Sequence, residues 1–151
     1  IKSEKLDGRS NELALENFKK IIKLFPDSKY VIDSKQKIIA INENIAAKNM
    51  DIALFYQNNN KYMSAIKRYN VVINDHASSK FTPEALHRLV EIYFSLGMID
   101  DANKTAAVLA YNYPKSEWYK RSYEIVGEEE NKTSLFSKIT NFLKSDNEEK
   151  E

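Results

Sequence analysis

The sequence predicts an all-α protein, and three observations lead to that prediction. Apolar residues recur three and four positions apart through most of the chain, which is the spacing of one helix face. No segment shows the sustained alternation of apolar and polar residues that is typical of a half-buried strand. Residues 30–58 contain neither glycine nor proline, so nothing in that long stretch interrupts a helix.

The N-terminal half is expected to form three helices. Residues 1–10 are polar and are expected to be a lead-in without a helix of their own, so the first helix runs from Asn11 to Phe25. The second spans residues 30–58 and would be about 40 Å long at roughly 1.5 Å per residue. The third runs from about Lys61 to Asp75, with its apolar residues on one side.

Capping signals mark the later helices. Thr82 and Pro83 are expected to start the fourth helix, as N-cap and first helical residue. Gly97 is expected to end it as a left-handed C-cap. Two further helices are expected at residues 100–111 and at residues 116–126, the last one closed by Gly127.

The helices pair, and the pairs repeat. The turn Phe25–Tyr30 (FPDSKY) returns as Tyr113–Trp118 (YPKSEW) and, more weakly, as His76–Phe81 (HASSKF). Each copy ends one helix, places a serine where it can cap the next, and adds an aromatic residue that can fix the entry angle. Twelve residues before each turn position lies an alanine, and the three are Ala14, Ala65 and Ala102.

This constellation resembles the tetratricopeptide repeat, a helical hairpin with tyrosine, alanine, aromatic and proline at these relative offsets. A small alanine lets two helices cross closely. The alanines are 51 and 37 residues apart, and the long second helix accounts for the larger spacing. The resemblance implies an α-solenoid over residues 11–127, with units near 11–26, 30–77 and 82–114 and a closing helix at 116–126. The first unit lacks its own first helix.

Longer segments resemble a more specific family. Glu84–Gly97 is similar to the final repeat of the BamD family, the outer-membrane lipoproteins of the β-barrel assembly machinery. Ala106–Tyr119 is similar to the closing motif of the α-proteobacterial members of that family. Ala14–Tyr30 and the long helix after it also fit, so the resemblance covers about residues 10–126.

This resemblance implies a non-enzymatic scaffold at the periplasmic face of the outer membrane. Members of the family are stacks of five repeats tethered by an N-terminal lipidated cysteine. Their C-terminal repeats bind the periplasmic POTRA region of BamA and other subunits. This chain matches only the later repeats and contains no cysteine, so membrane contact would depend on a lipid anchor that this sequence lacks. The alternative is a generic tetratricopeptide adaptor that binds a peptide segment in its concave groove.

Candidate partner-binding residues lie on the first helix of each pair, because those helices form the concave face of a repeat array. Leu54 and Phe94 are apolar where an exposed face would be polar, which indicates a partner surface. The alternative is that the long helix and the C-terminal helix bury these two side chains. The positions expected to be exposed are Met50, Leu54, Gln57 and Asn58 in the second unit and Glu84, His87, Glu91 and Phe94 in the third.

Arg68 stands next to Tyr69, one step off the buried side of its helix. The resemblance implies that Arg68 corresponds to the arginine that faces BamA in the family. Arginine can bind a carboxylate through two parallel hydrogen bonds, which lysine cannot reproduce. The alternative is an ordinary solvated surface charge.

Residues 133–145 are predicted to form an amphipathic helix between an acidic linker, residues 128–132, and a charged tail, residues 146–151. Three hypotheses compete for this helix: it caps the last repeat, it inserts into a groove of a partner, or it lies on an anionic membrane surface. Its apolar stripe consists of Leu135, Phe136, Ile139, Phe142 and Leu143, of which Phe136, Ile139 and Phe142 are candidate partner contacts.

Other classes of function find little support in the composition. The net charge is +1, so the chain has no strong positive electrostatic field that would attract nucleic acid. No cofactor and no metal are expected, because the chain has no cysteine, two separated histidines and three glycines. No catalytic set stands out, and Glu84 and Glu91 are interpreted as ordinary solvated acids. The aromatic cluster near Trp118 is interpreted as core packing.

Overall fold

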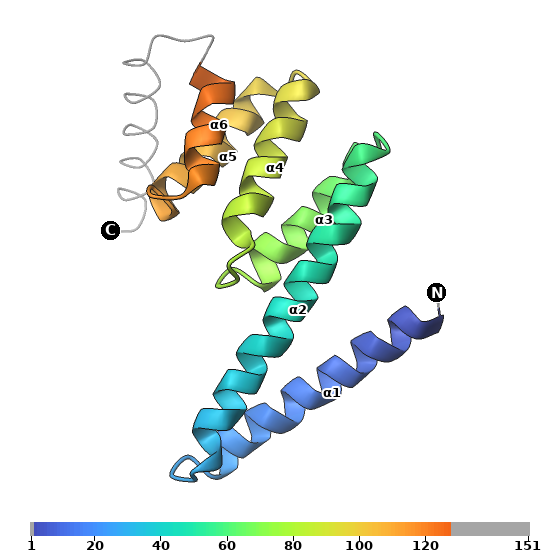
Figure 1. Ribbon diagram of the computed structural model, residues 1–151, viewed down its shortest axis with the longest axis vertical. Coiled ribbons are helices and arrows are strands. Elements are labelled where there is room, and N and C mark those ends of the chain that lie inside the picture. Colours follow the sequence, from blue (N-terminus) through green and yellow to red (C-terminus); the bar gives the residue numbers. More distant parts are fainter. Residues whose placement is uncertain (1, 128–151) are drawn as a thin grey trace, which may run out of the picture.

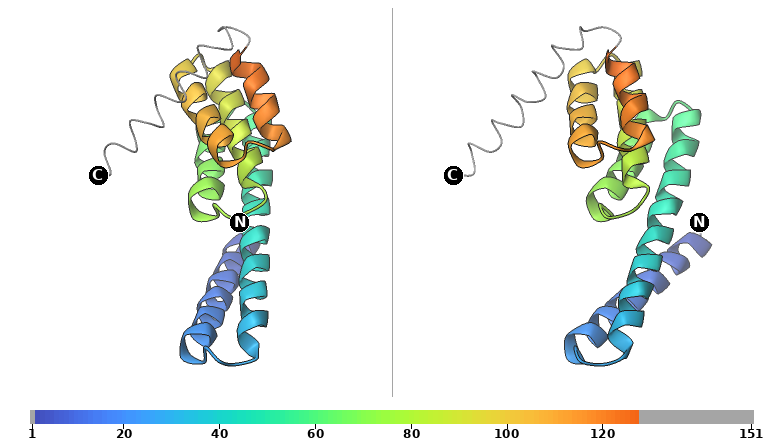
Figure 2. Two further views of the ribbon diagram at one scale, coloured as in Figure 1. Left: turned by 90° about the vertical axis from the view of Figure 1, so that its left-hand side faces the viewer. Right: turned by 60° about the vertical axis from the view of Figure 1, so that its left-hand side comes forward.

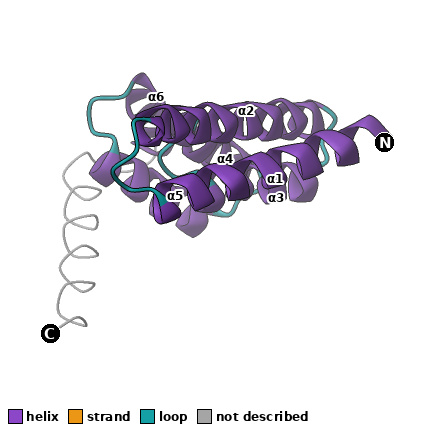
Figure 3. Cartoon of the chain, turned by 90° about the horizontal axis from the view of Figure 1, so that it is seen from below, coloured by secondary structure: helices purple, strands orange, loops and turns teal. Residues whose placement is uncertain are grey.

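The computed structural model describes residues 2–127, all of them in helices and the turns between them (Figures 1 and 3). This confirms the all-α prediction for the described part of the chain. The helices are α1 (Lys2–Leu24), α2 (Tyr30–Asn58), α3 (Tyr62–Asp75), α4 (Thr82–Ser95), α5 (Ile99–Asn112) and α6 (Glu117–Gly127).

The helices form an array of hairpins, as the repeat pattern predicts. α1 packs on the first part of the long helix α2, and α3 packs on its last part (Figure 1). α5 packs on α4, and α6 packs on both of them. The α1–α2 hairpin extends from one end of the molecule, while α4, α5 and α6 gather at the other (Figures 1 and 2). This is the tetratricopeptide-like arrangement of stacked helix pairs.

The first helix begins earlier than the sequence pattern predicts. α1 starts at Lys2 instead of near Asn11, so residues 2–10 are helical and the expected lead-in is wrong in that respect. The physical reason is that extending an existing helix costs far less than nucleating one. A polar segment attached to the amphipathic stretch can therefore continue it without an apolar face of its own.

The serines of the three turns accept backbone hydrogen bonds, but only Ser116 directly precedes its helix and bonds the N–H three residues on, as an N-cap does. The capping prediction is wrong for Ser28 and Ser79, because the capping positions of α2 and α4 are Lys29 and Phe81. The side-chain oxygens of Ser28, Ser79 and Ser116 accept hydrogen bonds from backbone N–H groups at or near the start of the next helix, at 3.3, 3.2 and 3.1 Å. Such bonds satisfy donors that the helix itself leaves unpaired. Gly97 adopts a left-handed φ of 73°, which confirms its predicted role after α4.

Thr82 is not the N-cap that the sequence suggests. The capping position of α4 is Phe81, and Thr82 is already the first helical residue. Its hydroxyl donates a hydrogen bond of 3.2 Å to the backbone carbonyl of His76. Because Ser79 already accepts the bond from the Phe81 N–H, Thr82 closes the turn instead of capping the helix.

Two core clusters hold the array together. The first joins α2, α3 and α4 and contains Ala65 and Tyr69, both with no exposed surface. The second joins α4, α5 and α6 and contains Val90, Ala102, Ala106 and Val126. The alanines of the second and third units are therefore buried at helix contacts, as predicted. Ala14 of the first unit is only half-buried.

Candidate protein-binding face on the inner helices

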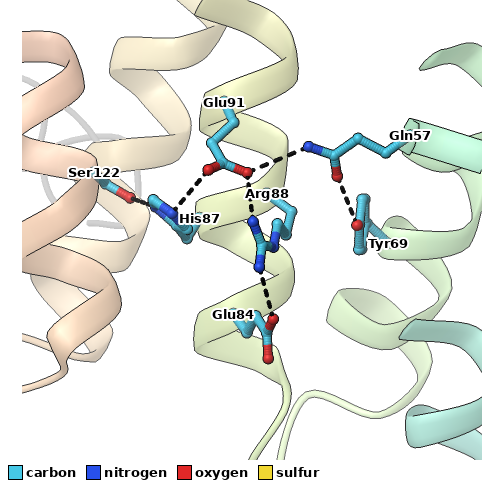
Figure 4. A network of polar contacts seen from close by, with 7 residues as sticks. All are labelled: Gln57, Tyr69, Glu84, His87, Arg88, Glu91 and Ser122. Atoms are coloured by element: carbon cyan, nitrogen blue, oxygen red, sulfur yellow. Dashed lines mark hydrogen bonds and ion pairs between the residues drawn. The ribbon is translucent and has the colours of Figure 1, made fainter. Parts of the chain in front are cut away.

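The first helices of successive pairs, α2, α4 and α6, form the side of the array that we call the inner face. α4 packs directly against α6, and it is linked to α2 by a side-chain hydrogen bond. The polar side chains of α4 lie three and four positions apart, so the helix presents them on one side. These side chains are Glu84, His87, Arg88 and Glu91, and they form the centre of a polar network (Figure 4).

Arg88 holds two carboxylates on its own helix. Its Nη1 atom lies 3.0 Å from Oε2 of Glu91, and its Nη2 atom lies 3.3 Å from Oε1 of Glu84. Burial by itself opposes the charge of Arg88. The hydrogen bonds and attraction from Glu91 and Glu84 outweigh that effect, so the pKa of Arg88 is raised above its usual value. Arg88 is therefore a fixed cation at the centre of the face.

Glu91 has the most partners in the network. It accepts hydrogen bonds from Arg88 and, at 3.3 Å, from Nε2 of Gln57, and it lies 3.3 Å from Nε2 of His87. Burial alone would raise the pKa of Glu91. The hydrogen bonds and positive charges of His87 and Arg88 more than offset it and lower the pKa to about 2. Glu91 therefore stays ionised across the ordinary pH range.

His87 ties α4 to α6. Its Nδ1 atom lies 2.8 Å from Oγ of Ser122, and its ring packs against Trp118 with 5.2 Å between the centroids. A hydroxyl both donates and accepts, so neutral and protonated imidazole can each satisfy Ser122 and Glu91 together. This side chain therefore bridges two helices in either charge state.

Gln57 carries the network from α4 to α3. Its Oε1 atom accepts a hydrogen bond of 2.7 Å from the hydroxyl of Tyr69, while its Nε2 atom donates to Glu91. The Tyr69 ring is fully buried, and this burial raises the pKa of its hydroxyl. The described network thus connects α2, α3, α4 and α6 through side chains alone.

Trp118 stands at the α6 side of this network. The guanidinium carbons of Arg88 and Arg121 lie 5.5 and 5.0 Å from the centroid of its ring, within the range of a cation–π contact. A shallow depression of about 310 Å³ opens between α4 and α6. The residues lining the depression are His87, Arg88, Glu91, Arg121, Glu124 and Ile125.

Two of the predicted contact residues are buried, so the expectation that they are exposed is wrong. Met50 is 7% exposed because it belongs to the core cluster between α2, α3 and α4. His87 is 3% exposed because Ser122 and Trp118 of α6 pack against it. In both cases a neighbouring helix covers the side chain.

The other inner-face residues keep some exposed surface. Leu54 is 37% exposed and Asn58 is exposed, whereas Phe94 is half-buried and packs against the second core cluster. Glu84 and Glu91 are half-buried and paired with Arg88, so their interpretation as ordinary solvated acids is wrong. A role in partner binding stays a prediction for this group.

Arg68 lies on α3 and is half-buried. Its Nη1 atom donates a hydrogen bond of 3.1 Å to Oδ1 of Asn49 on α2, and Nδ2 of Asn49 donates to the backbone carbonyl of Ile45 at 2.9 Å. The guanidinium is thus anchored at one end by a neutral partner. Its proposed bond to a carboxylate of a partner stays a prediction, as do the contacts of Phe136, Ile139 and Phe142, which lie outside the described residues.

Sequence reasoning missed two members of the network, Arg88 and Ser122. The spacing of Glu84, Arg88 and Glu91 at i, i+4 and i+7 is a signal that could have found the first, since such residues are neighbours on a helix. Nothing local identifies Ser122, because its contact with His87 joins residues 35 positions apart.

Comparison with known proteins identifies the family. A family model named YfiO and described as outer membrane lipoprotein matches residues 2–109. The chain belongs to the YfiO family. This membership places it at the periplasmic face of the outer membrane, and it confirms the resemblance read from the repeats. Within residues 2–127, no helix of this family member has the length and apolar character needed to span a membrane.

Curated relatives of this YfiO-family chain carry the name outer membrane protein assembly factor BamD. The relative from Rickettsia prowazekii is 43% identical over 114 residues, which is 76% of this chain and 45% of the relative. The relative from Caulobacter vibrioides is 35% identical over 122 residues, or 81% of this chain and 40% of the relative. The chain therefore spans less than half the length of these relatives.

Proposed function

We propose that this chain is a non-enzymatic scaffold in outer-membrane protein assembly. It binds the periplasmic POTRA region of BamA and other subunits of the assembly machinery through its helical hairpins. The observation that carries the proposal is its 43% identity to a relative named outer membrane protein assembly factor. A scaffold needs a rigid surface, and the hairpin array provides one.

The chemistry of the inner face supports binding over catalysis. Each ionisable group of the network on α4 is already engaged by another side chain: Arg88 by two glutamates, and His87 by Ser122 and Glu91. Charged groups that satisfy one another in this way hold helices in register, as structural ion-pair networks do. The network therefore fixes the positions of the residues around it.

Two of the contact residues that we propose, Gln57 and Glu91, belong to this network, and the others lie on α2, α3 and α4. Leu54 offers an exposed apolar side chain on α2, and Arg68 offers a guanidinium whose Nη1 atom is anchored by Asn49. An anchored guanidinium loses less conformational entropy on binding a carboxylate than a freely rotating one. The remaining proposed contacts are Gln57, Asn58, Glu91 and Phe94.

The experiment is a calorimetric titration of the chain with the isolated POTRA region of BamA. We expect saturable binding by the wild-type chain and weaker binding by Arg68→Lys, because an ammonium cannot make the paired bonds of a guanidinium. The matched control is Lys67→Arg, an exposed neighbour on the same helix, which should bind like the wild-type chain.

Two results would count against the proposal. If the folded wild-type chain does not bind the POTRA region, the proposed scaffold role through POTRA binding is wrong. If the wild-type chain binds but Arg68→Lys binds equally well, Arg68 is not a contact residue, and the proposed scaffold role is unaffected. Circular dichroism of each variant verifies that differences in affinity do not come from unfolding.

A further inference from the structure

Arg121 on α6 is exposed, and within the part of the chain that the structure describes its guanidinium has no hydrogen-bond or ion-pair partner. The contact that holds it is with the ring of Trp118, whose centroid lies 5.0 Å from the guanidinium carbon. A cation–π contact restrains a guanidinium but gives its N–H donors no oxygen acceptor. Arg88 contacts the same ring at 5.5 Å, but two glutamates of α4 bind its Nη atoms. Of the two arginines, Arg121 is therefore the one that can still bind a carboxylate.

The acidic neighbours of Arg121 on α6 do not neutralise it. Glu117, one turn earlier, is paired with Lys120 at 2.6 Å. The bond and the charge of Lys120 lower the pKa of Glu117, and Arg121 contributes least to that shift. Glu124, three residues after Arg121, makes no ion pair with it in the described structure. An exposed cation without a carboxylate partner attracts an acidic group of another molecule.

Arg121 lines the depression between α4 and α6, whose volume is about 310 Å³. This volume lies at the lower end of the range for ligand sites, which is about 300–1,000 Å³. A shallow depression of this size accommodates one or two side chains of a segment that runs across it. Ile125 lines the same depression and is half-buried, so it offers an apolar surface in addition to the cation.

The charges that line the depression favour a single carboxylate. Glu91 and Arg88 neutralise each other through their ion pair of 3.0 Å. Glu124 is exposed, and its carboxylate would repel a second acidic group. Because Arg121 is the cation without a partner, one acidic side chain completes the balance. A run of acids or a doubly charged phosphate therefore fits less well than one aspartate or glutamate beside an apolar residue.

The walls of the depression are fixed by contacts within the chain. His87 of α4 lies 2.8 Å from Oγ of Ser122 on α6 and 3.3 Å from the carboxylate of Glu91 (Figure 4). The ring of Trp118 restrains the guanidinium of Arg121. Groups that are already held in place lose little conformational entropy when a partner binds. The depression is therefore pre-organised for binding.

We propose that the depression between α4 and α6 is a second protein-binding site. Arg121 binds the side-chain carboxylate of one aspartate or glutamate of a partner segment through paired hydrogen bonds. An apolar side chain next to that acid in the same segment packs on Ile125. This site is separate from the proposed contact of Arg68, which lies on α3, so it does not depend on binding to the POTRA region.

The probes are two capped tetrapeptides, acetyl-Ala-Leu-Glu-Ala-amide and acetyl-Ala-Glu-Leu-Ala-amide, which place the apolar residue on either side of the acid. Trp118 is the single tryptophan of the chain and contacts Arg121, so its fluorescence reports binding at this site. We expect a saturable change with at least one probe. Its counterpart with glutamine in place of glutamate should bind about tenfold more weakly or worse, because a neutral amide loses the charge-assisted bonds. If neither acidic probe gives a saturable change at millimolar concentration, the proposal is wrong.

Substitutions on α6 locate the bound carboxylate. Arg121→Gln should weaken binding of the probe by about tenfold or more, and Arg121→Lys by about three- to tenfold. Lys120→Gln is the matched control, because it removes the same charge from the adjacent position and Lys120 does not line the depression. It should bind within about twofold of the wild-type chain. Equal losses in Arg121→Gln and Lys120→Gln would overturn the proposal, since the probe would then respond only to overall charge.

Glu124→Gln tests the same placement in the opposite direction. It removes a like charge from the depression, so the acidic probe should bind about two- to threefold more tightly. Weaker binding would contradict a carboxylate bound at Arg121. Circular dichroism verifies that each variant is folded, and each affinity is taken from the concentration dependence of the fluorescence.

Two further titrations separate this site from other modes of binding. If acetyl-Ala-Leu-Gln-Ala with a free C-terminal carboxylate binds and the acidic amides do not, the depression binds a chain terminus and the proposal is wrong. Arg68→Lys should bind the probes like the wild-type chain. If it binds them as weakly as Arg121→Gln does, the probes occupy the surface around Arg68 and the proposal also fails. Loss of POTRA binding with intact probe binding would count against the proposed scaffold role alone.

Discussion

His87 on α4 and Ser122 on α6 share a hydrogen bond of 2.8 Å between Nδ1 and Oγ, and both side chains are almost completely buried. Through the same imidazole, Ser122 is linked to Glu91 and from there to Gln57 on α2. One histidine therefore couples the closing helix to the helix pair two units before it. The polar network and the apolar core are two separate means of keeping the inner helices in register.

Ser122→Ala should lower the free energy of unfolding by about 1–2 kcal/mol, because it leaves Nδ1 of a buried imidazole without its partner. Urea denaturation followed by circular dichroism measures the change. Ser78→Ala is the control, since Ser78 is an exposed serine whose loss should cost less than about 0.5 kcal/mol. Equal losses in the two variants would show that the hydrogen bond contributes nothing to stability.

The lowered pKa of Glu91 leads to a prediction of how the free energy of unfolding depends on pH. Its pKa in the folded chain is about 2, below the ordinary 4.5, so the unfolded chain binds a proton first as pH falls. The stabilisation is complete above pH 4.5 and is lost as the pH drops toward 2. We expect it to be worth about 1–3 kcal/mol, allowing for solvent screening of a carboxylate that is 29% exposed.

The measurement is the free energy of unfolding of the wild-type chain and of Glu91→Gln between pH 7 and pH 2. The variant should be less stable at pH 7, and the two curves should converge as the wild-type carboxylate takes up its proton. Glu12→Gln, which alters an exposed glutamate, should follow the wild-type curve. A constant difference between wild type and Glu91→Gln at all pH values would mean that the charge of Glu91 is not what stabilises the fold.

The elements of the fold were predictable because they depend on local rules. The serines at 28, 79 and 116 accept backbone hydrogen bonds in their turns, Gly97 adopts a left-handed φ after α4, and the alanines at 65 and 102 are buried, all through interactions set by sequence spacing. The helical extension over residues 2–10 was not predictable from apolar periodicity, because that segment has no apolar face. Propagation from the neighbouring helix decides its structure.

The candidate site was predicted only in part. Its helices follow from the repeat register, but the burial of His87 depends on where α6 lies, and the burial of Met50 depends on how α3 and α4 meet α2. Those positions are set by contacts between residues far apart in sequence, which no local pattern encodes. The Arg88 ion pairs are an intermediate case, since both partners lie within one helix at recognisable spacing.

Ala65→Leu tests the helix crossing that defines the repeat. Ala65 has no exposed surface and lies between α2, α3 and α4, so a larger side chain must push a helix away. The free energy of unfolding should fall by about 1–3 kcal/mol in urea denaturation. Ala77→Leu alters an exposed alanine in a turn and should cost little, and a comparable loss there would argue against close packing at Ala65.

Leu54 and Met50 lie one turn apart on α2 but should respond differently to the same substitution. Leu54 is 37% exposed on the inner face, so Leu54→Gln should leave the free energy of unfolding within about 0.5 kcal/mol of wild type. It should also weaken binding to the POTRA region of BamA about five- to tenfold, because it removes an apolar contact.

Met50 is 7% exposed, so Met50→Gln should destabilise the chain by about 2 kcal/mol or more by burying an amide in the core. Denaturation curves and titrations of both variants separate the two effects. If Leu54→Gln destabilises the chain as much as Met50→Gln, the exposed leucine belongs to the core and not to a binding surface. If Leu54→Gln is stable and still binds with wild-type affinity, the contact with the partner lies elsewhere on the array.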